Sequence, residues 1–267
     1  MRKIDLETFL SKKPLIGMVH LLPLPGSVNA LPLQKVLDRA VKDAKTIIEG
    51  GMDAVLVENY GDRPFRKRVE PITVASMTLI VAEISRKIEA PVGVNVLRYD
   101  AVSALSIAHV TGADFIRSNA YTETVATGEG ILEPIAWEVQ QLKKRLNSET
   151  AVFADVLVKH GVTLSAHGDD YYHAAKEAVE RGLADAVIVT GRITGEPPQP
   201  KHILEAKKSG APVLLGSGMA PENAHLYREI IDGAIVGTYL HERSDWSAPI
   251  SLERVRKLVR SFRGREA

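Results

Sequence analysis

The sequence contains no cysteine among its 267 residues. Without thiols the chain has no disulfide, no thiolate-bound metal and no cysteine nucleophile. Disulfides are rare in reducing compartments, so the absence of cysteine fits a cytoplasmic protein, which is our expectation. A chain of this length can bury a large hydrophobic core without covalent cross-links.

An excess of charge of either sign is also missing. The sequence has 34 Lys and Arg against 33 Asp and Glu, with no long run of one sign. Such a balance argues against a nucleic-acid partner or a surface built for anionic membranes. No uncharged apolar stretch reaches the roughly 18 residues of a membrane span, and Met1–Phe9 mixes charged and apolar side chains. We therefore expect neither an integral membrane segment nor a secretory signal.

Three motifs of large enzyme classes do not occur. The sequence has no Gly-x-x-x-x-Gly-Lys-Ser/Thr P-loop, no His-Glu-x-x-His zinc motif and no Gly-x-Ser-x-Gly nucleophile elbow. The chemistry of P-loop nucleotide hydrolases, of zinc proteases and of serine hydrolases with this elbow is therefore not expected.

The sequence instead repeats one unit eight times: a short apolar run, a polar or glycine-containing turn, and an amphipathic helical pattern. The runs are nearly continuous in Val, Ile and Leu, as expected of parallel strands covered on both faces. We predict strands at Leu15–His20, Ala54–Asn59, Val92–Leu97, Asp114–Asn119, Val152–Val156, Ala186–Thr190, Val213–Ser217 and Ala234–Thr238.

Eight strands alternating with eight helices predict an α/β protein with a single (β/α)8 TIM barrel over residues 1–267. An open parallel sheet is the alternative. The longest irregular stretches all follow predicted strands rather than helices. In such barrels the loops on this side carry the active site, so we expect it at the mouth formed by the C-terminal ends of the strands.

The predicted strand ends and the turns after them carry polar side chains that the strand centres lack. Because every strand delivers its last residues to the same rim, we expect these side chains to converge. The candidates for catalysis are His20, Glu58, Asn95, Arg117 and Asp155. The candidates for lid or substrate contacts are Asn59, Asn119, Lys159, Thr190 and Arg192.

Glu58, Asp155 and His20 are the candidates for acid–base chemistry. A carboxyl group in a low dielectric can have its pKa raised toward neutral pH, and histidine titrates near there already. Glu58 and Asp155 are also the candidate ligands of a divalent metal such as Mg²⁺. For Glu58 a structural salt bridge to Arg98 or Arg117 is the alternative.

Small residues follow the last two predicted strands. Leu215-Gly-Ser-Gly218 precedes a predicted helix start at Pro221-Glu-Asn223, and Val236-Gly-Thr238 closes the last strand. Glycines let backbone N–H groups approach an anion, and barrels of this class bind phosphate after these two strands. The alternative is that these glycines serve tight turns. The predicted phosphate contacts are Gly191, Gly216, Ser217, Gly218, Gly237 and Thr238.

Two loops have the composition of lids. Ala126–Gly130 is small and glycine-containing, and Gly191–Pro198 places Arg192 where it can meet an anion. In the loop after Asp155, Lys159 is a candidate for a Schiff-base amine or a phosphate contact, with a solvated surface lysine as the alternative.

Several of these segments resemble the BtpA family, which is named after a photosystem I biogenesis factor. The matching segments are Pro14–Gly26, Glu58–Phe65, Gly93–Val96, Ile116–Asn119, Ala154–His160, Val189–Gly191, Thr194–Pro198, Leu215–Gly218 and Ala234–Thr238. The resemblance implies a barrel of the ribulose-phosphate-binding type. Tyr239–Asp245 departs from the lysine-rich loop of the family, so no lysine role is carried over there.

Together these features favour an isomerase, lyase or aldolase that binds a phosphorylated sugar or nucleotide-like molecule. Asp155 or Glu58 would act as general base and His20 as acid or electrophile, while Arg117 and Asn95 orient hydroxyls or stabilise negative charge. The alternatives are a non-catalytic assembly or biogenesis factor and a metal-dependent phosphohydrolase. We also expect a homo-oligomer, because closed symmetric oligomers are common among soluble proteins.

Overall fold

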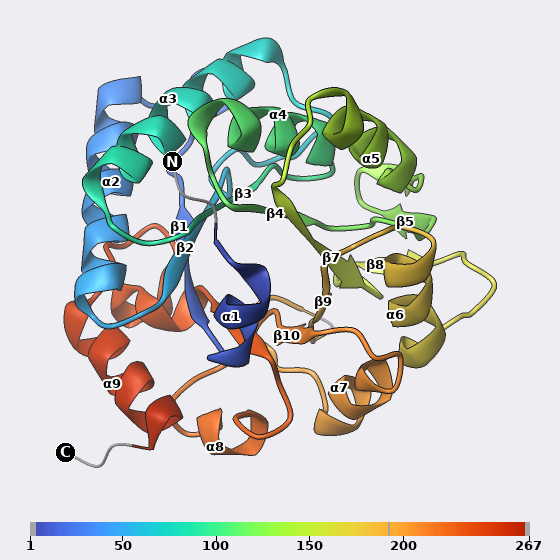
Figure 1. Ribbon diagram of the computed structural model, residues 1–267. Helices are drawn as coiled ribbons and strands as arrows, with labels where there is room; N and C mark the ends of the chain where they lie inside the picture. Colours follow the sequence, from blue (N-terminus) through green and yellow to red (C-terminus); the bar gives the residue numbers. More distant parts are fainter. Residues whose placement is uncertain (1–3, 192, 265–267) are drawn as a thin grey trace.

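The computed structural model describes residues 4–191 and 193–264 and has a closed barrel of eight parallel strands at its centre (Figure 1). Neighbouring strands follow the order β1, β11, β10, β9, β7, β4, β3, β2, and β2 pairs in turn with β1, which closes the ring. The predicted TIM barrel is therefore confirmed, and each predicted strand lies within two residues of an observed one. The strands are β1 Leu15–His20, β2 Ala54–Glu58, β3 Val92–Asn95, β4 Phe115–Ser118, β7 Ala151–Val156, β9 Ala186–Val189, β10 Val213–Leu215 and β11 Gly233–Val236.

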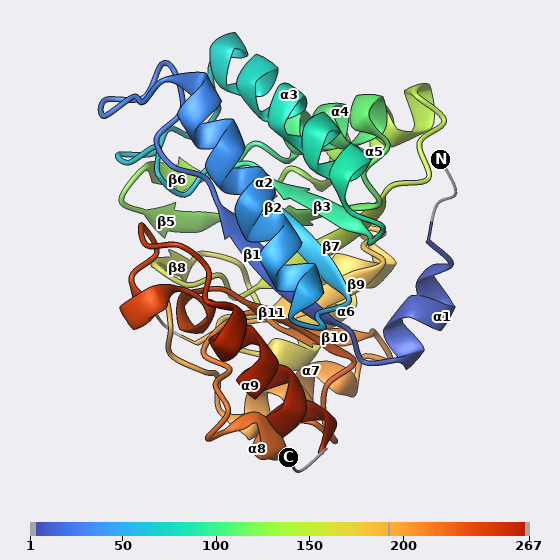
Figure 2. The same ribbon diagram turned by 90° about the vertical axis from the view of Figure 1, so that its left-hand side faces the viewer.

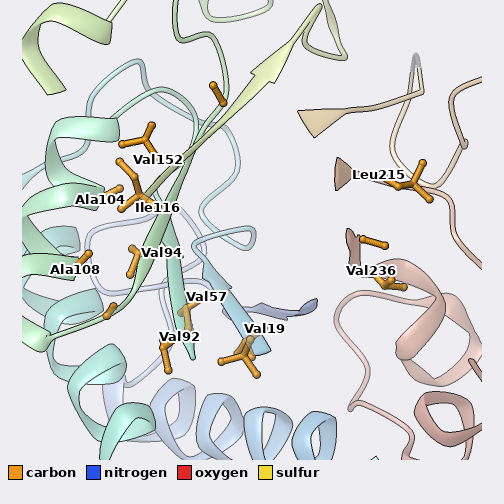
Figure 3. Close-up of a cluster of buried hydrophobic side chains, with 14 of the residues drawn as sticks. Val19, Val57, Val92, Val94, Ala104, Ala108, Ile116, Val152, Leu215 and Val236 are labelled. Atoms are coloured by element: carbon orange, nitrogen blue, oxygen red, sulfur yellow. The ribbon is translucent and has the colours of Figure 1, made fainter. Parts of the chain in front are cut away.

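Helices surround the barrel and cover its outer face. Apolar residues that recur at helical spacing pack against outward-facing strand residues in one large buried cluster. Figure 3 shows part of this layer, in which Val94 and Ile116 of the strands lie near Ala104 and Ala108 of α4. The helices are α2 Leu33–Glu49, α3 Pro71–Lys87, α4 Ala101–Thr111, α5 Ala136–Arg145, α6 Tyr171–Glu180, α7 Pro200–Lys207, α8 Ala224–Tyr227 and α9 Leu252–Arg263.

Alternate strand residues point inward and fill the barrel with a second buried cluster. The rings of Phe115 and Phe153 stack there with centroids 4.9 Å apart. A helix that sequence analysis did not predict, α1 Leu6–Ser11, packs Leu6, Phe9 and Leu10 against this cluster. Figure 2 shows α1 at one end of the barrel, so the opposite end is the open one.

The open end carries a small antiparallel sheet that was not predicted. Its strands are β5 Val125–Thr127, β6 Gly130–Leu132 and β8 Gly161–Thr163, with β5 in the middle (Figure 2). The segment Ala126–Gly130, expected to be a lid, is thus part of a hairpin paired to the loop after β7. Two 3-10 helices, η1 Thr238–Leu240 and η2 Glu242–Ser244, follow β11.

Within the described ranges, none of the helices combines the length and apolar character needed to cross a bilayer. The helix expected after Pro221 is short, since α8 begins only at Ala224 and ends at Tyr227.

The packing of the barrel interior makes Gly93 a sensitive position. A Cβ atom added there would collide with the ring of Phe115, whereas one added at Gly128 would meet no atom within 4 Å. We expect Gly93→Ala to lower the free energy of unfolding by roughly 1–3 kcal/mol, the usual cost of overpacking a core. Chemical denaturation measures the change, with Gly128→Ala as the matched control. Equal stability of the two variants would contradict the described packing.

Candidate functional site

A cavity of about 900 Å³ lies at the C-terminal ends of the barrel strands. Its lining comes from the ends of β1, β2, β4, β10 and β11 and from the loops that follow β2, β3, β7 and β9. Ten of the predicted site residues line it: His20, Glu58, Arg117, Asn119, Lys159, Gly216, Ser217, Gly218, Gly237 and Thr238. The expected convergence of the strand ends therefore occurs, although not every candidate reaches the cavity.

Arg117 and Asp155 form a buried ion pair at the ends of β4 and β7. The guanidinium donates two hydrogen bonds, from Nε to Oδ1 at 3.0 Å and from its terminal nitrogen to Oδ2 at 2.9 Å. Asn119 donates a third hydrogen bond to Oδ2 at 2.8 Å. Because both carboxylate oxygens of Asp155 are held, this geometry suits an anchor that fixes Arg117 better than a general base.

Glu58 is the less restrained of the two carboxyl groups. Asn95 donates to Glu58 Oε2 at 2.6 Å, while Oε1 lies 3.9 Å from Nε2 of His20. Burial raises the pKa of Glu58, which favours its neutral form. The alternative interpretation, a salt bridge from Glu58 to Arg98 or Arg117, is not found among the described residues, because Arg117 pairs with Asp155 and Arg98 lies 3.8 Å from Glu129.

His20 is joined to a second histidine from the other end of the chain. His241 Nδ1 lies 2.7 Å from the carbonyl oxygen of Ala248, which can only accept, so Nδ1 carries the proton. Burial lowers the pKa of His241, so its Nε2 has a lone pair and accepts from His20 Nδ1 at 3.0 Å. The unprotonated Nε2 of His20 therefore faces Glu58 and the cavity.

Burial, followed by the charges of nearby cationic groups, also lowers the pKa of His20 well below 6.5. The arrangement makes His20 a neutral proton acceptor toward the cavity, rather than the acid considered from the sequence. His241 was not among the predicted site residues. It lies 221 positions from His20, so only the fold reveals their contact.

Two aromatic residues and an arginine that the predictions also omitted extend this side of the mouth. The Tyr60 ring lies 4.6 Å from the His20 ring, and the Arg63 guanidinium lies 4.0 Å above Tyr60. The rings of Trp246 and Tyr60 stand edge to face, with their centroids 5.3 Å apart. A signal existed in the sequence, because Tyr60 and Arg63 belong to the segment after Glu58 that carries the family resemblance.

Small residues after β10 and β11 also line the cavity. Gly216, Ser217 and Gly218 follow β10, and Thr238 begins η1, whose first N–H groups have no partner within the helix. The Ser217 hydroxyl donates to the carbonyl oxygen of Glu196 at 3.0 Å. A Cβ at Gly237 would come within 2.8 Å of His20 Cε1, so only glycine lets β11 approach His20 this closely.

Several predicted site residues lie behind the cavity wall instead. Asn59 holds the backbone of Leu97, accepting from its N–H at 2.7 Å and donating to its carbonyl at 3.2 Å. Gly191 donates to Ser217 Oγ at 3.4 Å and is backed by Glu196. Thr190 is buried outside the lining. Arg192 lies outside the described residues.

The residues that the structure describes contain no cluster of three or more His, Asp or Glu side chains suited to hold a metal ion. Of the two predicted metal ligands, Asp155 is occupied by Arg117 and Asn119, and Glu58 by Asn95. A preformed Mg²⁺ site at these two carboxyl groups is therefore not supported by the donor geometry.

Comparisons with known proteins agree with the barrel architecture. Residues 11–264 match the sequence model described as the BtpA family. The chain is 45% identical to a protein of Pyrococcus abyssi, over 96% of this chain and 99% of that protein. It is 40% identical to the photosystem I biogenesis protein BtpA of Synechocystis, over 96% and 90% of the two chains.

Solved structures show the same fold at low sequence identity. A tryptophan synthase chain from Mycobacterium tuberculosis superposes with a TM-score of 0.63 at 16% identity, covering 98% of both chains. Phosphoribosyl anthranilate isomerase from Thermus thermophilus gives a TM-score of 0.58 at 14% identity, covering 95% of this chain and 100% of that one.

The histidine pair makes a prediction for nuclear magnetic resonance. We expect His20 to stay neutral, with its proton on Nδ1, as the pH falls through 6.5, because burial lowers its pKa. Two-bond ¹H–¹⁵N spectra identify the protonated nitrogen. The unfolded chain takes up the proton first as the pH falls, so this group lowers the free energy of unfolding below pH 6.5.

Two variants of His241 separate its role as acceptor from its bulk. His241→Gln keeps an acceptor for the N–H of His20, so the Nδ1 tautomer should persist. His241→Phe removes the acceptor, and His20 should populate both tautomers. A wild-type His20 with its proton on Nε2 would contradict the described relay.

Proposed function

This chain belongs to the BtpA family, and from that premise and the geometry of its barrel mouth we propose that it binds a phosphorylated small molecule and acts on it as an isomerase, lyase or aldolase. The observation that carries the proposal is that one cavity is lined both by the small residues after β10 and β11 and by the buried pair Glu58 and His20. A substrate anchored at the small residues would thus lie in the same cavity as Glu58 and His20.

The anchoring half of the proposal rests on Gly216–Gly218, Gly237 and Thr238. Backbone N–H groups in glycine-rich turns can approach an anion closely, and these residues line the cavity. Solved barrels with this fold include one named phosphoribosyl anthranilate isomerase, and the word phosphoribosyl denotes a phosphorylated sugar. The likeness of fold gives the proposal its substrate class.

The chemical half assigns the acid–base steps to Glu58 and His20. Burial raises the pKa of Glu58, which favours the protonated form that can donate, while the relay through His241 leaves Nε2 of His20 able to accept. The 3.9 Å between His20 Nε2 and Glu58 Oε1 is too long for a hydrogen bond, so a substrate hydroxyl can fit against both. Arg117, fixed by Asp155, would stabilise negative charge that develops on the substrate.

A second candidate function is a role in assembly, because a relative at 40% identity is named a photosystem I biogenesis protein. In that case the outer surface of the barrel would bind a partner, and the mouth would be dispensable. A metal-dependent phosphohydrolase is the third candidate and requires a divalent ion to recruit side chains that are now engaged with one another.

A thermal-shift screen tests phosphate binding. Pairs of sugars and nucleosides, each with and without its phosphate, are compared in the presence and absence of Mg²⁺. We expect only the phosphorylated members to raise the melting temperature, since a ligand at a hundred times its dissociation constant adds about 2.7 kcal/mol. Ser217→Asp should abolish the shift by placing negative charge at the anchor, whereas the neutral Ser217→Asn should retain more of it.

The outcomes separate the three candidates. A shift that depends on phosphate but not on Mg²⁺ supports the proposal. A shift that vanishes with chelator favours the phosphohydrolase. If no phosphorylated compound changes the melting temperature, the proposal fails and the assembly role gains weight.

The two carboxyl groups should respond differently to removal of their charge. Asp155→Asn leaves Arg117 buried without its counter-charge, so we expect a loss of roughly 3–5 kcal/mol in the free energy of unfolding. Glu58→Gln keeps the size of the side chain and an acceptor oxygen for Asn95, so stability should change by less than about 1 kcal/mol. Denaturant unfolding measures both.

Turnover of the best ligand from the screen then completes this test. Loss of a general acid or base typically costs about 10²–10⁴ in rate, and Glu58→Gln should show this loss. Full activity in Glu58→Gln would assign the chemistry to other residues.

A further inference from the structure

The loop after β7 holds strained backbone at the edge of the cavity. Leu157 has a φ of 50° and His160 a φ of 61°, both in the left-handed region that side chains other than glycine rarely adopt. Such strain persists only where surrounding contacts over-determine it, and it gathers at functional positions. The backbone between Leu157 and His160 is therefore a candidate functional segment.

Three contacts from other segments fix this turn. Glu123 Oε1 accepts from the N–H of Leu157 at 2.8 Å, and the Arg98 guanidinium donates to the carbonyl oxygen of Lys159 at 2.8 Å. His160 Nε2 lies 2.9 Å from the hydroxyl of Thr194. These contacts hold the backbone of Lys159 in place. A solvated surface lysine was the alternative interpretation of this residue.

The side chain of Lys159 lines the cavity, where it faces charges from several elements. Arg117, Asp155, Glu58 and Arg98 all act on it electrostatically. Among the described residues, no carboxylate oxygen lies within 4 Å of its amine. By contrast, the guanidinium of Arg117 is neutralised by Asp155 at 2.9 Å.

The environment of Lys159 disfavours its proton. Burial, and next the positive charge of Arg117, lower the pKa of Lys159 to about 8. At this pKa a larger fraction of Lys159 than of an ordinary lysine is the neutral amine near neutral pH, and the neutral amine is the nucleophilic form.

We propose that Lys159 forms an imine with the carbonyl carbon of an aldehyde or ketone substrate whose phosphate group is held at Gly216–Gly218. The inference rests on the proposed function, which it deepens by naming the reactive group of the substrate. It is carried by the pinned turn, by the unpaired amine in the cavity, and by the presence of Glu58 and His20 on the same lining.

The step balances with the groups that line the cavity. The amine nitrogen bonds to the carbonyl carbon, the carbonyl oxygen takes the proton of Glu58, and His20 Nε2 takes one proton from nitrogen. The C–O bond then breaks, the hydroxyl leaves as water with the proton from His20, and the nitrogen lone pair forms the C=N bond. The positive iminium is balanced by the Glu58 carboxylate.

An imine also explains why these groups lie together. The iminium draws electrons from the neighbouring carbon, which eases removal of a proton or cleavage of a C–C bond, the chemistry of isomerases, lyases and aldolases. A lysine that only bound phosphate would be best fully charged, and the burial and the neighbouring Arg117 oppose that charge.

Reductive trapping tests the imine. The protein is incubated with glyceraldehyde 3-phosphate or dihydroxyacetone phosphate, then reduced with sodium borohydride and analysed by peptide mass spectrometry. We expect one adduct per chain, on Lys159, exceeding that of glyceraldehyde or dihydroxyacetone by roughly tenfold, which corresponds to about 1.4 kcal/mol of phosphate binding. Lys159→Arg should abolish the adduct while Lys67→Arg, at an exposed lysine, should keep it.

A second measurement needs no substrate and guards against a misfolded variant. After reductive ¹³C-methylation, the Lys159 amine should titrate near pH 8 in the wild-type protein, well below the ordinary lysine value of 10.5. Titration of the Lys159 amine near 10.5 would overturn the proposal.

The outcomes distinguish the imine from the proposed function. A phosphate-dependent thermal shift without an adduct overturns the imine and leaves phosphate binding standing. Adducts spread equally over exposed lysines, unchanged in Lys159→Arg, also overturn it. An adduct on Lys159 without preference for phosphate supports the imine and contradicts the phosphate anchor, and the absence of both shift and adduct rejects both.

Discussion

Pairing of the first barrel strand with the last is the constraint on which the mouth depends. Gly17 of β1 lies opposite Val236 of β11, and this register places the end of β1 beside Gly237. The chain that follows β11 then turns back over His20 and delivers His241 to it. An open sheet would leave these two segments at opposite edges, so closure of the barrel creates the histidine relay.

Some of the described charged side chains at the mouth of the barrel have a nearby group of opposite charge, and one does not. The pair of Arg117 with Asp155 is internally neutral, and Arg98 lies 3.8 Å from Glu129. Lys159 is left without a close counter-ion among the described residues. Burying charges costs free energy unless partners compensate, so the mouth is electrostatically suited to a ligand that brings negative charge.

Much of this architecture could be predicted from the sequence. The features that could not be predicted all depend on three-dimensional contacts. The strands follow from continuous apolar runs, and their polar ends follow from barrel geometry, so the convergence of Glu58 and Arg117 on one cavity was foreseeable. The sequence could not predict which carboxyl group would pair with Arg117, because Asp155 and Glu58 both lie at strand ends. Only the three-dimensional distances show that Asp155 is locked and Glu58 is not. The relay to His241 depends on a contact across 221 positions, for which local pattern carries no signal.

Several buried polar atoms near the described strand ends have no hydrogen-bond partner, which bears on whether the mouth binds a ligand. In the described part of the chain, Ser118 Oγ, Asn119 Oδ1 and Thr190 Oγ1 are buried without a hydrogen-bond partner. Folded proteins satisfy nearly all such atoms, and each exception carries a cost of about 1–3 kcal/mol. These residues lie at or just after the ends of β4 and β9, and of the three Asn119 lines the cavity. A barrel that served only as a scaffold for a partner could replace them with apolar side chains and gain stability. A barrel that binds a polar substrate at its mouth gains from Asn119 Oδ1, because such a ligand has donors to offer it.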